Sequence, residues 1–361
     1  MSSENKIHIC LIIPSLASGG MERVMVELAH FLSLKSNVKL SMITLTNSNS
    51  FYTIPQNMDY YEPEFLIKQS NRLVSLFKTF FYVRRTLKKI QPDVLLSFGG
   101  KYNSFVLAAS SGLKINTFIS DRSKPTISYG FFLDFLNPIL YKYSTGIIAQ
   151  TEIAKNVLYK KTSHNNIVVI PNPVKIPIIT NDIKENYILN VGRFVATKQQ
   201  ELLIEYFAKI LPENPNWKVV FLGDGPLLTK VKEKAIQLNI QNNVQFIGAT
   251  ENIEMYYRKS SIFAFTSISE GFPNALLEAM SYNLACISFD CSAGPTELID
   301  DGSNGYLIPE ENHELYIERL KTLMTDNELR FNFANLAREK AKRFNIENIG
   351  ESFYNVLVHK N

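Results

Sequence analysis

Two glutamates, Glu270 and Glu278, stand on either side of a Gly-Phe-Pro-Asn turn in the stretch SEGFPNALLEAM. The apolar run before the turn predicts a strand, and the leucine-rich segment after it predicts a helix with Asn274 as its N-cap. The amides of residues 275–277 would then be free to bind an anion, which the helix dipole favours. Carboxylates accept hydrogen bonds from sugar hydroxyls. The stretch therefore indicates a nucleotide-sugar site, with two solvated surface glutamates as the alternative.

Two further strand-end loops in the same half of the chain carry groups that could bind a diphosphate. Arg193 follows a predicted strand, and Lys198 lies five residues on, just before a helix. Arginine offers a planar fork and lysine a point charge to phosphate oxygens, so both favour an anion at the sheet edge that carries the glutamates. The turn Gly223-Asp224-Gly225 requires glycine dihedrals, and by itself it indicates only a turn.

A glycine pair, Gly19-Gly20, occupies the first strand-to-helix turn of the chain. Because these residues have no side chains, the backbone could approach a phosphate or a sugar closely. The pair lacks the G-x-G-x-x-G spacing of a dinucleotide site, which disfavours a dinucleotide-dependent oxidoreductase.

The elements that must position these residues alternate between strand and helix along the chain. Short continuous apolar runs such as YILNVGR and WKVVFLGDG are typical of parallel strands covered on both faces. The segments between them have helical spacing, so we expect doubly wound α/β sheets. Prolines at 171, 173 and 177 predict a linker at about 171–185. We therefore expect two Rossmann-like domains, 1–172 and 173–344, facing each other across a cleft.

Composition narrows the class of protein. The 361 residues are 45% hydrophobic and 20% charged, as in soluble globular proteins of two domains. We expect no signal peptide and no membrane span, because the polar N-terminus leads directly into a strand and no long apolar run exists. Three cysteines are too few for a disulfide framework. A net charge of +4 (38 basic minus 34 acidic residues) is too small to indicate nucleic acid as a partner.

Taken together, the motifs resemble the family 4 retaining glycosyltransferases of the GT-B fold. They are Gly19-Gly20, PNPV at 171–174, VGR with Lys198, GDGP at 223–226, and SEGFPNALLEAM followed by GPTELIDDGSNGYLI. The resemblance runs from residue 7 to about residue 350. It implies an N-terminal acceptor-binding domain, a C-terminal nucleotide-sugar-binding domain, and a last helix at about 345–361 that packs back on the N-terminal domain.

The resemblance also implies roles for individual residues. Glu278 would bind the ribose, and Glu270 would hold hydroxyls of the transferred sugar and be catalytic together with Arg193 and Lys198. The base would lie near Ile247 and Gly248. The implied donor-binding residues are Gly19, Gly20, Arg193, Lys198, Gly223, Asp224, Gly225, Ile247, Gly248, Glu270, Gly271, Phe272, Pro273, Asn274, Ala275, Leu276 and Glu278.

The implied mechanism needs no metal and no other cofactor, and the chain contains no Asp-x-Asp motif. Positive side chains would stabilise the leaving diphosphate, and front-face attack would retain the configuration, with a donor phosphate oxygen taking the acceptor proton. One departure concerns a histidine that many relatives carry after a late strand of the N-terminal domain. The corresponding stretch here has Asp121, Arg122 and Ser123, of which Asp121 or Arg122 is expected on the sugar side.

Residues 65–91 contain seven lysines and arginines, no acid, and interleaved leucine and phenylalanine. A cationic helix with aromatics is typical of binding to an anionic membrane surface. The alternative is a helix that packs its apolar face on the domain and leaves its basic face in water. Residues 128–144 add a second aromatic stretch. A polyprenyl-diphosphate-linked saccharide at the inner face of the cell membrane would explain both.

We therefore expect a cytoplasmic, peripheral membrane glycosyltransferase of surface-polysaccharide or lipid-linked glycan assembly. It would move a hexose or N-acetylhexosamine from a nucleotide sugar, with UDP expected ahead of GDP or ADP. The alternative is a nucleotide-sugar epimerase or a phosphorylase of the same fold, against which the basic aromatic helix argues. A non-enzymatic sugar-binding protein with two lobes is disfavoured because it would carry an export signal.

Overall fold

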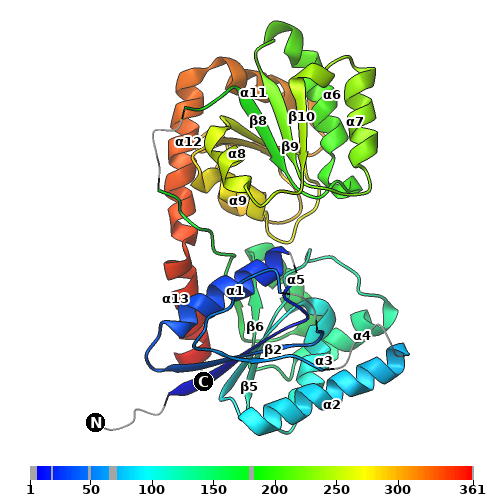
Figure 1. Cartoon of the computed structure of the whole chain (residues 1–361), viewed down its shortest axis with the longest axis vertical. Coiled ribbons are helices and arrows are strands. Elements are labelled where there is room, and N and C mark those ends of the chain that lie inside the picture. Colours follow the sequence, from blue (N-terminus) through cyan, green and yellow to red (C-terminus); the bar gives the residue numbers. More distant parts are fainter. Residues whose placement is uncertain (1–5, 18, 48–49, 65–70, 179–182, 360–361) are drawn as a thin grey trace. The chain divides into compact units, whose positions relative to one another are not determined.

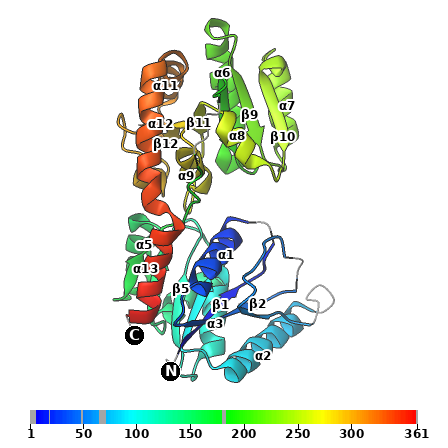
Figure 2. The same ribbon diagram turned by 60° about the vertical axis from the view of Figure 1, so that its left-hand side comes forward.

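The computed structural model describes residues 6–17, 19–47, 50–64, 71–178 and 183–359. The chain divides into two compact units, shown in Figures 1 and 2. Unit 1 comprises Met1–Pro173 and Ile346–Asn361, and unit 2 comprises Val174–Asn345. The division lies one residue from the expected boundary. Part of the expected linker, residues 179–182, falls outside the described residues.

Unit 1 is built, in its described residues, on a parallel sheet with the strand order β3-β2-β1-β4-β5-β6-β7. The strands are β1 (Ile7–Ile13), β2 (Val38–Thr44), β3 (Asp59–Tyr61), β4 (Val94–Phe98), β5 (Asn116–Ser120), β6 (Gly146–Ala149) and β7 (Ile167–Val169). The helices are α1 (Gly20–Ser33), α2 (Arg72–Ile90), α3 (Gly100–Ser110), α4 (Phe131–Tyr141), α5 (Glu152–Thr162) and α13 (Ile346–His359).

Alternation along β1 explains why helices cover both faces of this sheet. Ile9, Leu11 and Ile13 pack into one hydrophobic cluster with α1 and α13, whereas Cys10 and Ile12 pack into another with α2 and α3. Successive side chains of a strand point to opposite faces, so a continuous apolar run needs cover on both. The last helix, α13, thus belongs to the core of the first unit (Figure 2).

Unit 2 repeats the design, in its described residues, with the strand order β10-β9-β8-β11-β12-β13, all parallel. The strands are β8 (Tyr187–Val191), β9 (Lys218–Leu222), β10 (Val244–Gly248), β11 (Ile262–Phe265), β12 (Ala285–Phe289) and β13 (Tyr306–Ile308). The helices are α6 (Gln200–Ile210), α7 (Leu228–Gln237), α8 (Ile253–Lys259), α9 (Asn274–Ser281), α10 (Pro295–Leu298), α11 (His313–Thr325) and α12 (Asn327–Ala341). One hydrophobic cluster joins the sheet to α6, α7 and α11, and another joins it to α8, α9 and α12.

Both sheets have the order of a doubly wound fold, which confirms the expected fold class. In unit 1 the chain runs from β1 outward to β2 and β3 on one side, and then returns to the other side of β1 to form β4 to β7. In unit 2 it runs from β8 to β9 and β10 on one side, and then to β11, β12 and β13 on the other. Ligands of such sheets bind at the carboxyl ends of the strands where this reversal occurs. The reversal lies between β1 and β4 in unit 1 and between β8 and β11 in unit 2.

Gly350 tests how closely α13 packs on α1. A Cβ at this position would lie 2.5 Å from the ring of Phe31 in α1. We expect Gly350→Val to destabilise unit 1 by about 1–3 kcal/mol, because the added methyl groups overpack the helix contact. Hydrogen exchange would show faster exchange of α1 and α13 amides, with the amides of unit 2 as an internal control. Unchanged exchange in α1 would contradict the packing.

Candidate functional site

The loops after β8 and β11 meet at the reversal point of unit 2, and an ion pair joins them. Lys198 Nζ donates to Glu270 Oε1 at 2.5 Å. The backbones of the two loops are also bonded, because Ile268 N donates to Thr197 O at 3.0 Å and Thr266 Oγ1 donates to Lys198 O at 2.8 Å. The structure therefore brings together two residues expected to be catalytic.

The Lys198–Glu270 pair is largely shielded from water. The side chains are 23% and 11% exposed, respectively, and Lys198 Nζ lies 5.2 Å from the centre of the Phe265 ring. Partial desolvation strengthens the attraction between the charges and also penalises any loss of one partner. The site thus has a fixed cation and a fixed carboxylate in the absence of any ligand.

The loop after β9 packs directly on the loop after β8. Gly223 has φ +132°, and a Cβ there would lie 2.1 Å from the carbonyl oxygen of Gly192, so only glycine fits. Phe194 N donates to Asp224 O at 3.0 Å, which ties the two loops together. Arg193, at the junction, is exposed and makes no ion pair or side-chain hydrogen bond within the described residues.

The expected base position lies at the end of the neighbouring strand, β10. Gly223 N donates to Gly248 O at 2.8 Å, so Gly248 sits beside the β9 loop. The ladder between β9 and β10 shifts register between Phe246 and Gly248, which leaves Ile247 in an irregularity at the strand end. Four strand-end segments that the sequence singled out thus share one edge of the sheet.

The start of α9 corrects two details of the expected anion site. Asn274 is the first residue of the helix and not its N-cap, which is Pro273, and no side chain caps this end. The amides of Leu276 and Leu277 are not free, because both donate to Pro273 O at 3.1 Å. Proline cannot donate a hydrogen bond but its carbonyl accepts.

Other amides of the same turn remain available. Gly271 N, Phe272 N and Ala275 N donate no hydrogen bond to any residue that the structure describes. Phe272 is held in place because its ring is buried and lies 6.3 Å from that of Phe344. The turn therefore presents three amides next to the Lys198–Glu270 pair, which is a suitable environment for an anion.

Glu278 is positioned by a residue that sequence reasoning missed. Tyr257 of α8 is buried, and its hydroxyl donates to Glu278 Oε2 at 3.0 Å and lies 3.3 Å from Ala275 O. The Tyr257 ring also stacks on Tyr282 at 5.2 Å. A buried tyrosine hydroxyl normally finds a partner, but no local pattern in the sequence indicated that the partner would be Glu278.

Cys291 follows β12 and comes close to the charged pair, yet it cannot serve as a nucleophile. Burial raises the pKa of its thiol to about 12, and the charge of Glu270 acts in the same direction. The reactive form of cysteine is the thiolate, so this residue remains protonated at neutral pH.

In unit 1, the Gly19-Gly20 turn lies at the reversal point and carries a carboxylate. The Tyr52 hydroxyl accepts from Gly19 N at 3.2 Å and donates to Gly19 O at 2.9 Å. A Cβ at Gly19 would meet Glu22 Oε2 at 2.2 Å, and burial raises the pKa of Glu22. In either protonation state Glu22 can hydrogen-bond a hydroxyl, whereas it adds no positive charge that would attract a phosphate. The turn therefore suits sugar hydroxyls better than the diphosphate.

Asp121 and Arg122, which stand where many relatives have a histidine, make different contacts. Asp121 follows β5, and its Oδ1 accepts from Ser123 N at 3.1 Å and from the Tyr129 hydroxyl at 2.9 Å. The Arg122 guanidinium lies 4.4 Å from the centre of the Phe98 ring and 5.3 Å from that of Phe353 in α13. Its enclosure lowers its pKa. Arg122 therefore fastens α13 to the sheet, which leaves Asp121 as the sugar-side candidate.

Part of the predicted basic helix lies outside the described residues, namely 65–70. The remainder forms α2, whose buried side is built of small or aliphatic side chains: Ser75, Thr79, Val83, Thr86 and Leu87. Of the larger side chains, Phe80, Tyr82 and Ile90 are partly buried against the same hydrophobic cluster, whereas Phe77 and Phe81 are each 64% exposed. The helix thus packs an apolar face on the domain, as the alternative states, and also exposes phenylalanines on its other side.

The cations of α2 fall into two groups. Arg84 Nη1 donates to Ala109 O at 2.9 Å and to Ser111 O at 2.8 Å, so it satisfies carbonyls at the end of α3 and is not a membrane-facing residue. Lys78, Arg85, Lys88 and Lys89 are exposed. At 100° per residue they share a face with Phe77 and Phe81.

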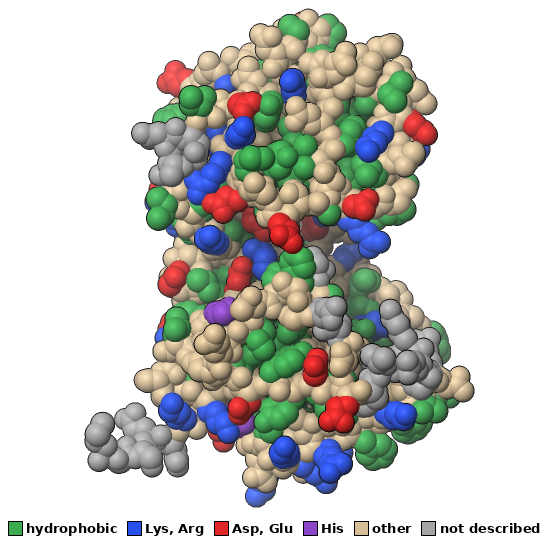
Figure 3. Space-filling model, in the orientation of Figure 1, with side chains coloured by type: hydrophobic (Ala, Val, Ile, Leu, Met, Phe, Trp, Pro, Cys, Tyr) green, Lys and Arg blue, Asp and Glu red, His purple; other side chains and the backbone are tan. Residues whose placement is uncertain are grey.

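Helix α4 presents a second outward aromatic surface. Phe131 is 93% exposed, and Phe132 and Phe135 are also largely exposed. Helices α2 and α4 both pack on α3. Figure 3 shows hydrophobic side chains next to lysines and arginines on this unit. Within the part of the chain that the structure describes, no helix is long and apolar enough to cross a bilayer.

The described residues include no cluster of three histidine, cysteine, aspartate or glutamate side chains that could hold a metal ion.

Comparison with known proteins places the fold and the family. The chain matches solved GT-B glycosyltransferase structures along its length: TarM of S. aureus (TM-score 0.83, 15% identity, 98% of this chain and 99% of that one), and HepE of Anabaena in complex with UDP and glucose (TM-score 0.79, 18% identity, 98% and 100%). Its fold is GT-B.

The model for "Glycosyl transferases group 1" matches residues 174–340, within unit 2. A Campylobacter jejuni enzyme is 28% identical over 98% of both chains; it is named GalNAc-alpha-(1->4)-GalNAc-alpha-(1->3)-diNAcBac-PP-undecaprenol alpha-1,4-N-acetyl-D-galactosaminyltransferase. Residues 174–340 therefore form a glycosyltransferase group 1 domain, and the chain is similar along nearly its whole length to an enzyme named as a glycosyltransferase.

The coupling between Lys198 and Glu270 can be measured in a double-mutant cycle of Lys198→Met and Glu270→Gln. We expect a coupling energy of about 1–3 kcal/mol, because the pair is partly desolvated. The single tryptophan, Trp217, is buried in unit 2 and reports its unfolding in urea. The exposed pair Lys209–Glu314 is the control, with an expected coupling below about 1 kcal/mol. Equal coupling in both cycles would contradict a shielded pair.

Proposed function

We propose that this glycosyltransferase moves a hexose or N-acetylhexosamine from a UDP-sugar to a polyprenyl-diphosphate-linked saccharide. It would do so with retention and without a metal ion, at an anionic membrane surface, in polysaccharide or lipid-linked glycan assembly. The main support for a nucleotide-sugar donor site is the Lys198–Glu270 pair at the reversal point of unit 2. It lies beside three amides that have no partner among the described residues.

The diphosphate is assigned to Lys198, Arg193 and the amides of Gly271, Phe272 and Ala275. When it binds, Lys198 gains a second anionic partner, and Glu270 can accept hydrogen bonds from hydroxyls of the transferred sugar. The positive groups stabilise the charge that develops on the diphosphate as the bond from C1 to the phosphate oxygen breaks. The acceptor oxygen forms its bond to C1 on the same face and passes its proton to that phosphate oxygen.

The ribose is assigned to Glu278. Tyr257 donates to Glu278 Oε2 and so orients the carboxylate, which can accept hydrogen bonds from a vicinal diol. The base is assigned to Ile247 and Gly248, at the end of β10. UDP is favoured among the nucleotides because the similar HepE structure contains UDP. The family assignment favours this transferase reaction over the epimerase or phosphorylase.

The proposal of a lipid-linked acceptor is based on the surface of unit 1. The outward faces of α2 and α4 combine exposed phenylalanines with the cations Lys78, Arg85, Lys88 and Lys89. Aromatic and cationic side chains on one face match the apolar boundary and the anionic headgroups of a bilayer. The similar C. jejuni enzyme is named for an undecaprenyl-diphosphate-linked acceptor. This chemistry supports a lipid-linked acceptor and a peripheral location at the cytoplasmic face of the membrane.

Calorimetry of UDP, GDP and ADP binding, with and without EDTA, tests the donor site. We expect UDP to bind and chelation to have no effect. Glu278→Gln should weaken UDP binding by about 1–3 kcal/mol, because a ribose hydroxyl loses its charged acceptor. The control is Glu318→Gln, an exposed residue on α11. UDP binding of unchanged strength in Glu278→Gln would reject the ribose assignment, and loss of UDP binding in EDTA would reject metal independence.

Co-sedimentation with phosphatidylserine vesicles tests the membrane surface. Replacing Lys78, Arg85, Lys88 and Lys89 by glutamine should weaken binding by about 1 kcal/mol per cation, while UDP binding by unit 2 persists. Arg84 is kept because it stabilises the end of α3.

A variant of equal net charge is the matched control for this experiment: Lys209, Lys230, Lys232 and Lys342, all exposed in unit 2, are replaced by glutamine. If this control loses as much vesicle binding as the α2 variant, the effect is one of net charge and the assignment to α2 is wrong.

A further inference from the structure

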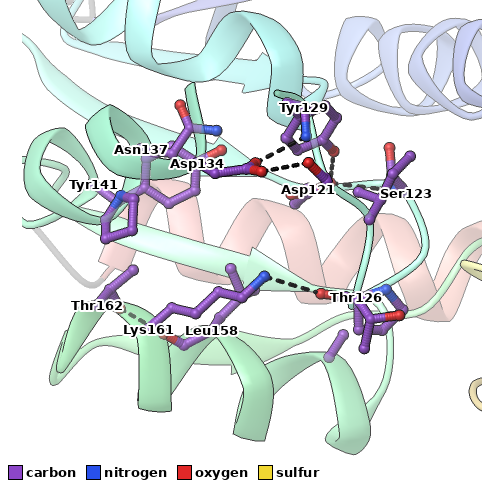
Figure 4. A pocket seen from close by; sticks show the side chains of 15 residues that line it. Asp121, Ser123, Thr126, Tyr129, Asp134, Asn137, Tyr141, Leu158, Lys161 and Thr162 are labelled. Atoms are coloured by element: carbon purple, nitrogen blue, oxygen red, sulfur yellow. Dashed lines mark hydrogen bonds between the residues drawn. The ribbon is translucent and has the colours of Figure 1, made fainter. Parts of the chain in front are cut away.

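Unit 1 contains a pocket of about 340 Å³ that the donor site does not use. It lies between the loop after β5, helix α4 and helix α5, as Figure 4 shows. Asp121, Tyr129 and Asp134 line one side, and Leu158 and Lys161 of α5 line the other. A volume of this size is typical of small-molecule sites.

Asp121 is the polar group with unused hydrogen-bonding capacity. Its Oδ1 accepts from Ser123 N and from the Tyr129 hydroxyl, whereas its Oδ2 accepts no hydrogen bond within the described part of the chain. Burial raises the pKa of Asp121, as expected for a carboxyl with little water around it. A hydroxyl donor from a ligand would compensate this desolvation.

A donor faces this acceptor from the opposite wall. Among the described residues, Lys161 Nζ makes one long hydrogen bond of 3.4 Å, to Pro125 O, so it can also donate to a ligand. Asp134 is already used: it accepts from Tyr129 N at 2.8 Å and from the Ser128 hydroxyl. The pocket thus offers one acceptor and one donor on opposite sides.

The remaining lining selects the class of ligand. Ala154, Leu158, Ile127 and Pro138 form an apolar part of the wall. Two carboxylates against one ammonium disfavour a phosphate. A ligand with hydroxyls and one small apolar group would match both the polar and the apolar parts, and these are the properties of an N-acetylated hexose.

We propose that this pocket binds an N-acetylhexosamine unit of the saccharide acceptor, and this inference rests on the function proposed above. Helix α4 connects the two: Asp134, Pro138 and Tyr141 line the pocket, while Phe131 and Phe135 of the same helix are exposed to solvent next to them. The saccharide of a lipid-linked acceptor would enter the pocket while its lipid remains at the aromatic face.

Saturation-transfer NMR on the full chain without nucleotide tests the inference. The probes are the methyl α-glycosides of N-acetylglucosamine and N-acetylgalactosamine, with methyl α-glucoside for comparison. We expect an N-acetylated probe to bind and its acetyl methyl group to receive the strongest saturation. Asp121→Asn should weaken this binding about tenfold, because one charged acceptor is lost. Thr126→Trp, at an exposed position of the lining, should abolish it by filling the pocket.

Lys160→Met is a control outside the pocket, because Lys160 lies on α5 but does not line the pocket, and it should leave the binding unchanged. Absence of binding by both N-acetylated probes, equal binding of the glucoside, or undiminished binding in Thr126→Trp would overturn the inference. UDP binding by unit 2 should be the same in all variants. If the glycosides bind as expected but UDP does not bind to the parent chain, the donor proposal fails and the pocket assignment stands.

Discussion

The candidate donor site depends on one constraint of parallel sheets: all strands end at the same edge, and a crevice forms only where the strand order reverses. In unit 2 the reversal between β8 and β11 brings Lys198 beside Glu270, although 72 residues separate them. In unit 1 the same reversal, between β1 and β4, positions the Gly19 turn. The apolar clusters on both faces of each sheet maintain this strand order, so the core determines where charged groups can meet.

A second constraint is that charged side chains withdrawn from water need partners within the protein. Lys198 has Glu270, Glu278 has Tyr257, and Asp121 has the Tyr129 hydroxyl. Each contact fixes a polar side chain and leaves capacity for a further hydrogen bond, because a carboxylate accepts several and an ammonium donates three. A preorganised site of this kind needs little rearrangement when substrate binds. These three contacts therefore orient the side chains that are proposed to bind substrate.

The sequence predicted the sheets and most helices, because apolar runs and helical spacing are local signals. It also predicted that Lys198 and Glu270 share an edge, since parallel strands require it. It placed the start of α9 one residue too late, because it took Asn274 as the N-cap in place of Pro273. It also took the Leu276 and Leu277 amides as free, whereas both donate to Pro273 O. Tyr257 was missed and Arg84 was assigned to the membrane, because their partners, Glu278 and the carbonyls ending α3, are distant in sequence.

The outward phenylalanines of α2 and α4 require a cause outside the fold. An ordinary surface helix buries its largest apolar side chains, yet α2 buries Ser75 and Thr79 and exposes Phe77 and Phe81. The same helix keeps Val83 and Leu87 fully buried, so its orientation satisfies the core and still leaves Phe77 and Phe81 in water. Contiguous exposed apolar surface of this kind marks an interaction site. Cations share this face, so the lipid surface proposed above, which combines apolar and anionic groups, would match both kinds of side chain.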